Sequence, residues 1–255
     1  MKILITEKIA QSGIELLKKD FDVDLKLNLT QDEILQCIGE YDALIVRSAT
    51  KVTSQILDKG INLKVVGRAG NGVDNIDIET ATSKGIIVVN TPESNNISTA
   101  EHTIALMLSL ARNIPQANAS LKEKKWLRSS FKGVELYGKT AAVLGMGRIG
   151  SIVASRLKSF GMKVVGYDPY ISEERFKKLG VEKIDSIEEV MHCSDFITIH
   201  LPKTEETVGI IGEKEFNMAK PNLRIINCAR GGLIDENALY NALKEGKIAG
   251  AAMDV

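Results

Sequence analysis

Short apolar runs alternate with amphipathic stretches almost from the first residue of the chain. The runs in the first part predict strands at residues 2–6, 23–27, 43–47, 65–67 and 86–90. Segments such as 9–18 and 32–38 lie between these runs and have the periodicity of amphipathic helices. Strands and helices that alternate in this way are typical of a parallel sheet with crossover helices.

A loop at Asn90-Thr91-Pro92 ends this first series. The segment from Ser98 to Glu101 follows it, with the Ser-x-x-Glu spacing of a capping box. We therefore expect a helix to begin there and to end near Arg112, because Pro115 ends or bends a helix. This helix is the natural bridge to a second domain.

The alternation resumes at Lys139, with strands predicted at 140–144, 163–168, 196–200, 224–228 and 249–254. We find no internal repeat of fixed period. The pattern predicts an α/β protein of two Rossmann-like, doubly wound parallel-sheet domains. Ordinary domain sizes place the first at about residues 1–95 and the second at 96–255.

Composition narrows the possible partners. The 255 residues include 33 basic and 33 acidic side chains, which argues against nucleic acid or an anionic membrane surface as the main partner. The chain shows neither a signal-peptide core nor a stretch long enough to span a membrane. Its three cysteines form no C-x-x-C pair and its three histidines are scattered, so we expect a cytoplasmic protein without a metal site.

The strongest chemical motif is the G-x-G-x-x-G of residues 145–150, which follows an apolar run and opens a helical pattern. In such a turn Gly145 permits the tight bend, Gly147 lets the backbone approach a pyrophosphate, and Gly150 lets helix and strand pack closely. The amides of the helix start, at Arg148 and Ile149, would face that pyrophosphate. The motif therefore predicts a dinucleotide site.

Asp168 ends the next predicted strand, about twenty residues after the turn. A carboxylate at this place accepts hydrogen bonds from the adenosine ribose and repels a 2′-phosphate, which favours NAD over NADP. Two alternatives remain. One is a tight strand-to-helix turn with an incidental surface aspartate, and the other is FAD, whose motif usually lies near the N-terminus.

Several segments together resemble the D-isomer-specific 2-hydroxyacid dehydrogenases, in the same order along the whole chain. They are 46–53, 66–75, 90–92, the helix that contains 100–103, 145–150 and 227–232. The likeness is greatest to the members that oxidise 3-phospho-D-glycerate at the entry to serine synthesis. It implies hydride transfer between the substrate's C2 and nicotinamide. It also implies a flavodoxin-like substrate domain, formed by the N-terminal part and a returning C-terminal segment, with an NAD-binding Rossmann domain inserted between them. The expected assembly is a homodimer or homotetramer with the region around Trp126 in the interface.

The resemblance also implies roles for single residues. Arg230 matches the arginine that holds the substrate's carboxylate and 2-oxygen, and it follows a predicted strand, where α/β sheets present ligand groups. Arg47 and Arg68 match positions that face the substrate, and two arginines suit a phosphorylated acid. Each arginine could instead be a surface ion-pair partner. Gly70 and Asn71 fall beside the substrate, where relatives often have Thr in place of Asn71.

Further residues match cofactor contacts in the family. Expected near the cofactor, partly through backbone atoms, are Leu201, Pro202, Cys228, Ala229 and Asp254. The pattern makes neither His102 nor His200 the catalytic base. It implies a glutamate and a histidine beyond Val255, so we expect the chain to be a piece of a longer protein, with its second domain incomplete at the C-terminus and little turnover alone.

Two other functions fit the same residues. One is a different D-2-hydroxyacid dehydrogenase, such as a glyoxylate or hydroxypyruvate reductase. The other is a non-catalytic NAD-sensing protein that keeps the fold to recognise a partner. Rates on phosphorylated and unphosphorylated acids would distinguish a glyoxylate or hydroxypyruvate reductase from an enzyme that oxidises 3-phospho-D-glycerate. NADH binding without turnover would indicate the non-catalytic protein.

Overall fold

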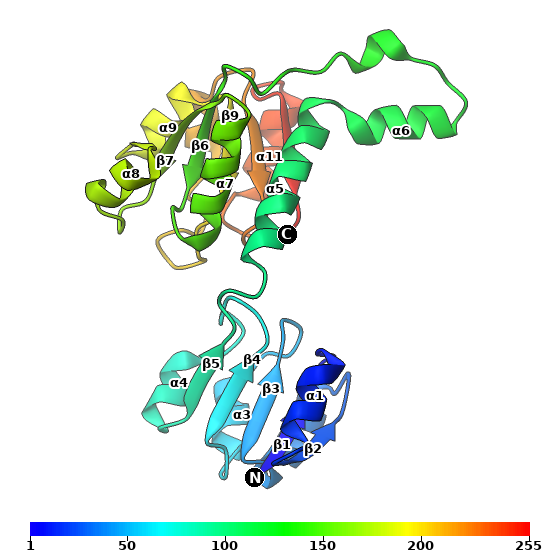
Figure 1. The fold of residues 1–255 in the computed structure, drawn as a ribbon, viewed down its shortest axis with the longest axis vertical. Helices are drawn as coiled ribbons and strands as arrows, with labels where there is room; N and C mark the ends of the chain where they lie inside the picture. The colour runs from blue at the N-terminus through cyan, green and yellow to red at the C-terminus, as the bar shows by residue number, and fades with distance from the viewer. The chain divides into compact units, whose positions relative to one another are not determined.

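The computed structural model describes all of residues 1–255. The chain forms two compact units, residues 1–95 and residues 96–255. Both units are built on sheets in which every strand pair is parallel, as the alternating pattern predicts (Figure 1). None of the helices combines the length and the apolar character that a membrane span requires.

The first unit contains a five-stranded sheet in the order β2-β1-β3-β4-β5. Its strands are β1 (Lys2–Ile5), β2 (Asp22–Leu25), β3 (Ala43–Val46), β4 (Val65–Arg68) and β5 (Ile87–Asn90). This is the flavodoxin-like order, in which the chain reverses direction across the sheet between β1 and β3. Ligand sites in such sheets lie at the carboxyl ends of the strands beside that point.

Helices cover the two faces of this sheet unequally. Helix α1 (Gln11–Leu17) packs Ile14 on one face, against Ile3, Ile5 and Ala43. The other face carries a larger apolar core under three helices and one 3-10 turn. These are α2 (Gln31–Cys37), η1 (Ile38–Glu40), α3 (Ser54–Lys59) and α4 (Ile78–Ser83).

The second unit contains a six-stranded sheet in the order β11-β10-β9-β6-β7-β8. Its strands are β6 (Thr140–Leu144), β7 (Lys163–Tyr167), β8 (Glu182–Lys183), β9 (Phe196–Ile199), β10 (Arg224–Asn227) and β11 (Gly250–Met253). Counted from the first strand of this unit, the order is 3-2-1-4-5-6, which is the order of dinucleotide-binding sheets. Strand β8 was not predicted, because its two residues are polar and leave no hydrophobic signal.

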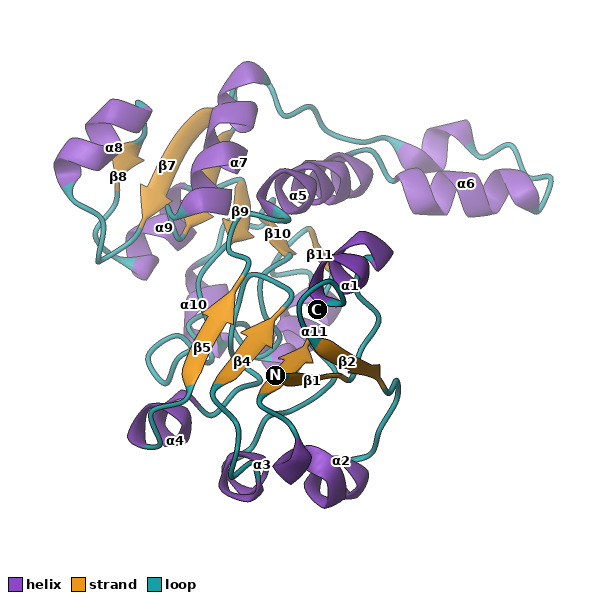
Figure 2. Ribbon diagram, turned by 60° about the horizontal axis from the view of Figure 1, so that its bottom comes forward, coloured by secondary structure: helices purple, strands orange, loops and turns teal.

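Helices cover both faces of the second sheet (Figure 2). Helices α5, α7 and α8 contribute to one apolar core, and α9, α10 and α11 contribute to the other. Their bounds are α5 (Asn96–Ala111), α7 (Arg148–Ser159), α8 (Glu173–Leu179), α9 (Ile187–Cys193), α10 (Glu213–Met218) and α11 (Glu236–Lys244). Helix α6 (Ile114–Lys122) follows α5 after a break at Asn113, and η2 (Arg128–Phe131) comes next.

The expected start of α5 at Ser98 is wrong, because the helix already begins at Asn96. Its buried side chains recur at helical spacing from Asn96 through Ala100 and Met107, so packing extends the helix beyond the capping signal. The expected end is correct within a residue. A capping box does exist at Thr30, whose hydroxyl accepts from the amide of Glu33 while the carboxylate of Glu33 accepts from the amide of Thr30.

Candidate functional site

Parallel strands point their carboxyl ends to one edge of the sheet, and in the second unit this edge collects the predicted cofactor residues. The glycine turn follows β6, Asp168 follows β7, Leu201 and Pro202 come after β9, and residues 228–230 follow β10. Asp254 follows β11. The structure thus brings together groups that lie up to about a hundred residues apart in the chain.

The glycine turn is packed too tightly for side chains at two of its three glycines. Gly145 has a φ of 92°, and a Cβ there would lie 2.7 Å from the carbonyl carbon and oxygen of His200. A Cβ on Gly150 would collide with the carbonyl oxygen of Gly145. Glycine at these positions therefore lets α7 begin directly against the end of β6.

Gly147 differs, because a Cβ at this residue would meet no atom within 4 Å. Gly147 is also the residue before the first turn of α7, and no side chain caps the helix start. The free amides of this turn and the positive end of the helix dipole thus face open space beside Gly147 and the exposed Arg148. Ile149 instead packs against the core beneath. This arrangement fits the pyrophosphate of a dinucleotide.

Asp168 is bonded to the glycine turn itself. Its Oδ2 accepts from the amide of Met146 at 2.9 Å, and its Oδ1 accepts from the amide of Tyr170 at 3.0 Å. The residue is buried, with 9% of its surface exposed. These bonds hold the carboxylate beside the turn, and each oxygen keeps a second lone pair with which to accept a ribose hydroxyl. The sequence motif does not reveal the bond from Met146.

The turn that carries Arg230 is held by Asn227, the last residue of β10. The Asn227 side chain donates to the carbonyl of Arg230 and accepts from the amide of Ala229, each at 2.9 Å. Asn227 has 1% of its surface exposed, while Arg230 is half-buried. Asn227 was not among the predicted site residues. A polar side chain at the end of an otherwise apolar strand is the signal that could have revealed it.

The remaining predicted cofactor residues are a mixture of buried and exposed groups. Leu201 and Cys228 are buried, and burial raises the pKa of the Cys228 thiol, which stays protonated and unreactive. Pro202 is exposed beside Leu201. Asp254 is exposed and its Oδ1 lies 3.1 Å from Nε2 of His102, a contact between the end of β11 and helix α5.

His200 lies at the end of β9, with its backbone carbonyl packed under Gly145. Burial lowers the pKa of its imidazole to about 4, and Nε2 lies 3.0 Å from the hydroxyl of Thr198. A general base needs a pKa near the working pH. At pH 7 His200 is therefore neutral and poorly basic.

The first unit holds its four predicted substrate residues at the carboxyl edge of its own sheet. Arg47 is exposed after β3, while Arg68 ends β4 and donates from Nε to Oδ1 of Asn75 at 3.2 Å. The guanidinium of Arg68 lies over Gly70, where a Cβ would collide with it. The carbonyl of Asn71 accepts a hydrogen bond from the side chain of Asn90.

Comparisons with known proteins point in one direction. Residues 104–255 match the family model for the D-isomer specific 2-hydroxyacid dehydrogenase NAD binding domain. The D-3-phosphoglycerate dehydrogenases of Methanocaldococcus jannaschii and Archaeoglobus fulgidus are 54% and 49% identical to the chain, over all of its length. The matches cover 49% and 48% of those proteins, so the chain spans about half the length of the curated relatives it matches.

Solved structures give the same result for the fold. The TT0316 protein of Thermus thermophilus is 31% identical with a TM-score of 0.91, and the match covers all of this chain and 82% of that one. A D-lactate dehydrogenase of Aquifex aeolicus, solved with NAD and lactic acid, is 30% identical with a TM-score of 0.89. That match covers all of this chain and 77% of the Aquifex protein.

Proposed function

Because the chain belongs to the D-isomer-specific 2-hydroxyacid dehydrogenase family, we propose that its protein is an NAD-dependent D-3-phosphoglycerate dehydrogenase. The proposed reaction oxidises 3-phospho-D-glycerate to 3-phosphooxypyruvate, with NADH and a proton as the other products. This step opens serine synthesis. The 54% identity to the Methanocaldococcus D-3-phosphoglycerate dehydrogenase, over the whole of this chain, is the observation that carries the proposal.

The residues of the second unit have separable roles in this proposal. The amides at the start of α7 hold the pyrophosphate beside Gly147, and Asp168 accepts from the adenosine ribose. NAD supplies the hydride acceptor when it is bound. Arg230 pairs with the substrate carboxylate and steadies negative charge on the 2-oxygen, while Asn227 keeps the arginine's turn in place.

The arginines of the first unit distinguish the proposed substrate from other 2-hydroxy acids. Arg47 follows β3 and Arg68 is the last residue of β4. These strands are neighbours in one sheet and pair with Val46 beside Arg68. Two guanidinium groups at one strand edge complement a dianionic phosphate better than the neutral end of lactate or glyoxylate. We therefore assign the phosphate of the substrate to this pair.

The test compares the complete protein on 3-phospho-D-glycerate and on D-glycerate, which differ only in the phosphate. We expect a strong preference for the phosphorylated acid, reduced about tenfold or more in Arg47→Ala and in Arg68→Ala. Lys59→Ala is the matched control, because Lys59 is an exposed cation in the last turn of α3. If both arginine variants kept the preference, the phosphate assignment would fail. Faster turnover of glyoxylate or hydroxypyruvate would favour the reductase alternative.

We also propose that the protein is a cytoplasmic homo-oligomer. The segment from α6 to η2 exposes Leu121, Trp126 and Leu127, with 78% of the Trp126 surface open to solvent. A hollow of about 550 Å³ lies beside Trp126, lined also by Arg128, Ser129 and Lys132. Apolar side chains gathered on one segment favour burial against a second copy. Light scattering gives the molar mass of the wild-type protein and of Trp126→Ser. We expect the mass of an oligomer for the wild type and a lower mass for Trp126→Ser. An unchanged mass in the variant would place the interface elsewhere.

A further inference from the structure

We propose that Glu7 and Asn75 are positioning residues that hold the Arg47 loop by hydrogen bonds, Glu7 to its backbone amides and Asn75 to its backbone carbonyls. By fixing this loop they set the affinity of the site for a phosphorylated substrate. The inference rests on the proposed function, because it assigns the phosphate to Arg47 and Arg68. Neither Glu7 nor Asn75 needs to touch the substrate in this role. Together we call them the loop clamp, and the loop is residues 47–51.

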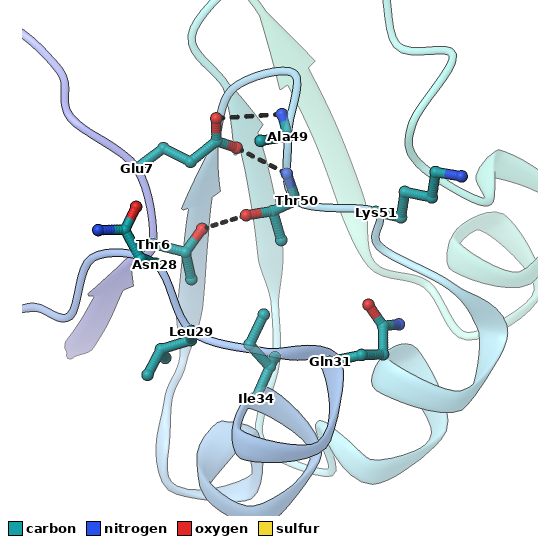
Figure 3. A pocket seen from close by; sticks show the side chains of 9 residues that line it. All are labelled: Thr6, Glu7, Asn28, Leu29, Gln31, Ile34, Ala49, Thr50 and Lys51. Carbon is teal, nitrogen blue, oxygen red and sulfur yellow. Dashed lines mark hydrogen bonds between the residues drawn. The ribbon is translucent and has the colours of Figure 1, made fainter.

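Glu7 follows β1 and grips the donor side of the loop (Figure 3). Its carboxylate accepts from the backbone amides of Arg47 at 2.8 Å, Thr50 at 2.9 Å and Ala49 at 3.1 Å. Beside it, the hydroxyls of Thr6 and Thr50 lie 2.9 Å apart. One side chain therefore satisfies three amides of a loop that belongs to no helix or strand.

The charge of Glu7 strengthens this grip. Burial alone would raise the pKa of the Glu7 carboxyl, but the hydrogen bonds from the amides of Thr50, Arg47 and Ala49 outweigh it and lower the pKa below its usual range. Glu7 is therefore ionised at neutral pH. Hydrogen bonds to an ionised acceptor are about twice as strong as those between neutral groups.

Asn75 grips the acceptor side of the same loop. Its side-chain amide donates to the carbonyl of Arg47 at 2.7 Å and to the carbonyl of Thr50 at 2.6 Å. The N–H and the C=O of Arg47 are thus both held by side chains, the first by Glu7 and the second by Asn75. The backbone on both sides of the Arg47 Cα is fixed while its side chain remains exposed.

Asn75 links this loop to the second arginine. Its Oδ1 accepts from Nε of Arg68 at 3.2 Å, so one amide group binds the loop and orients the neighbouring guanidinium. The missing side chain at Gly70 gives that guanidinium its place over the backbone. Asn75 itself is anchored, because its carbonyl accepts from the amide of Val52 at 2.7 Å.

Packing does little to hold the loop. Arg47, Ser48 and Ala49 are exposed, and a cavity of about 220 Å³ lies against the loop, lined by Thr6, Glu7, Thr50 and the apolar Leu29 and Ile34 among others (Figure 3). Several polar groups of this cavity already bond to the loop or to each other. With open space on one side and solvent on the other, the loop depends on the clamp for its position.

The experiment measures steady-state kinetics of Glu7→Gln and Asn75→Asp in the complete protein. Glu7→Gln removes the charge and one acceptor oxygen, and Asn75→Asp removes the donors but keeps an acceptor for Arg68. We expect the KM for 3-phospho-D-glycerate to rise about tenfold in each, with kcat and NADH affinity within about twofold of wild type. Glu15→Gln, at an exposed site on α1, is the matched control.

A double-mutant cycle separates positioning from general destabilisation. If Glu7 acts through Arg47, the effect of Glu7→Gln on KM should largely disappear in an Arg47→Ala background. Additive effects, or an unchanged KM in both single variants, would overturn the loop clamp. A wild-type enzyme without phosphate preference would instead refute the proposed function. If one of the two variants fails to fold, hydrogen exchange of the amides of residues 47–50 is measured in the variant that does fold. Exchange no faster than in the wild type would also overturn the loop clamp.

Discussion

Gly147 and Gly150 belong to the same turn, yet substituting each by alanine should have different consequences. A Cβ at Gly147 meets nothing within 4 Å, and its φ of −67° is negative, so alanine needs no left-handed backbone there. Gly147→Ala should therefore leave the free energy of unfolding unchanged or raise it by up to about 1 kcal/mol, since alanine has fewer unfolded conformations to lose. A Cβ at Gly150 collides with the carbonyl oxygen of Gly145.

The magnitudes follow from this difference. Gly150→Ala must push α7 away from β6, and overpacking of this kind costs about 1–3 kcal/mol. In Gly147→Ala the new methyl group occupies the space through which a pyrophosphate approaches the helix amides. The loss of one or two charge-assisted hydrogen bonds, each worth about 1.5–3 kcal/mol, weakens NADH binding about tenfold at least.

Two measurements on the same preparations decide the matter. Urea denaturation without cofactor gives the free energy of unfolding, and titration of NADH fluorescence gives the dissociation constant. We expect Gly147→Ala to lose NADH affinity at full stability and Gly150→Ala to lose both. If Gly147→Ala bound NADH as tightly as wild type, the pyrophosphate would not lie beside Gly147 and our assignment of the turn would be wrong.

Three further predictions test other parts of the second unit. Asp168→Ala should weaken NADH binding about tenfold or more and NADPH binding much less, because it removes both a ribose acceptor and a charge that repels the 2′-phosphate. Competitive titrations of the two cofactors would show this difference, and equal losses of affinity would contradict the role of Asp168. The pKa of His200 is about 4 when folded and about 6.5 when unfolded, so stability present above pH 6.5 should fall as the pH drops towards 4. The loss at pH 5 should be about 1–2 kcal/mol, because the residue as a whole is half-buried. Urea denaturation at pH 7 and 5 should show this difference shrinking in His200→Gln, and an undiminished difference would assign the pH dependence elsewhere. Asp195→Ala removes the acceptor, 2.9 Å away, of the amide of the half-buried Thr140 and should cost about 1–3 kcal/mol. Asp185→Ala, at an exposed ion pair, should cost under about 1 kcal/mol, and similar losses in the two variants would refute the distinction.

The alternation of apolar runs and helical patterns was enough to predict both parallel sheets, because local periodicity reports which face of each element is buried. The place of the glycine turn and of Asp168 at the edge of the sheet could be predicted for a related reason. Parallel strands place their carboxyl ends on one edge, so a residue that ends a strand can be assigned to that edge without knowing the fold in detail. Strand β8 was not predicted, because a two-residue polar strand leaves no hydrophobic pattern. The first turn of α5 was not predicted either, because packing extends the helix beyond its capping signal.

Partners across the chain were decided by tertiary structure alone. Glu7 meets the amide of Arg47 across 40 residues, Asn75 meets the carbonyl of Arg47 across 28, and Asp168 meets the amide of Met146 across 22. These bonds join side chains to backbone amides and carbonyls, which every residue type carries, so no residue pattern marks the partner in advance. The low pKa of His200 has the same origin, because the burial that causes it exists only in the folded chain. Local chemistry can therefore be predicted from the sequence, while the contacts that orient it exist only after the chain has folded.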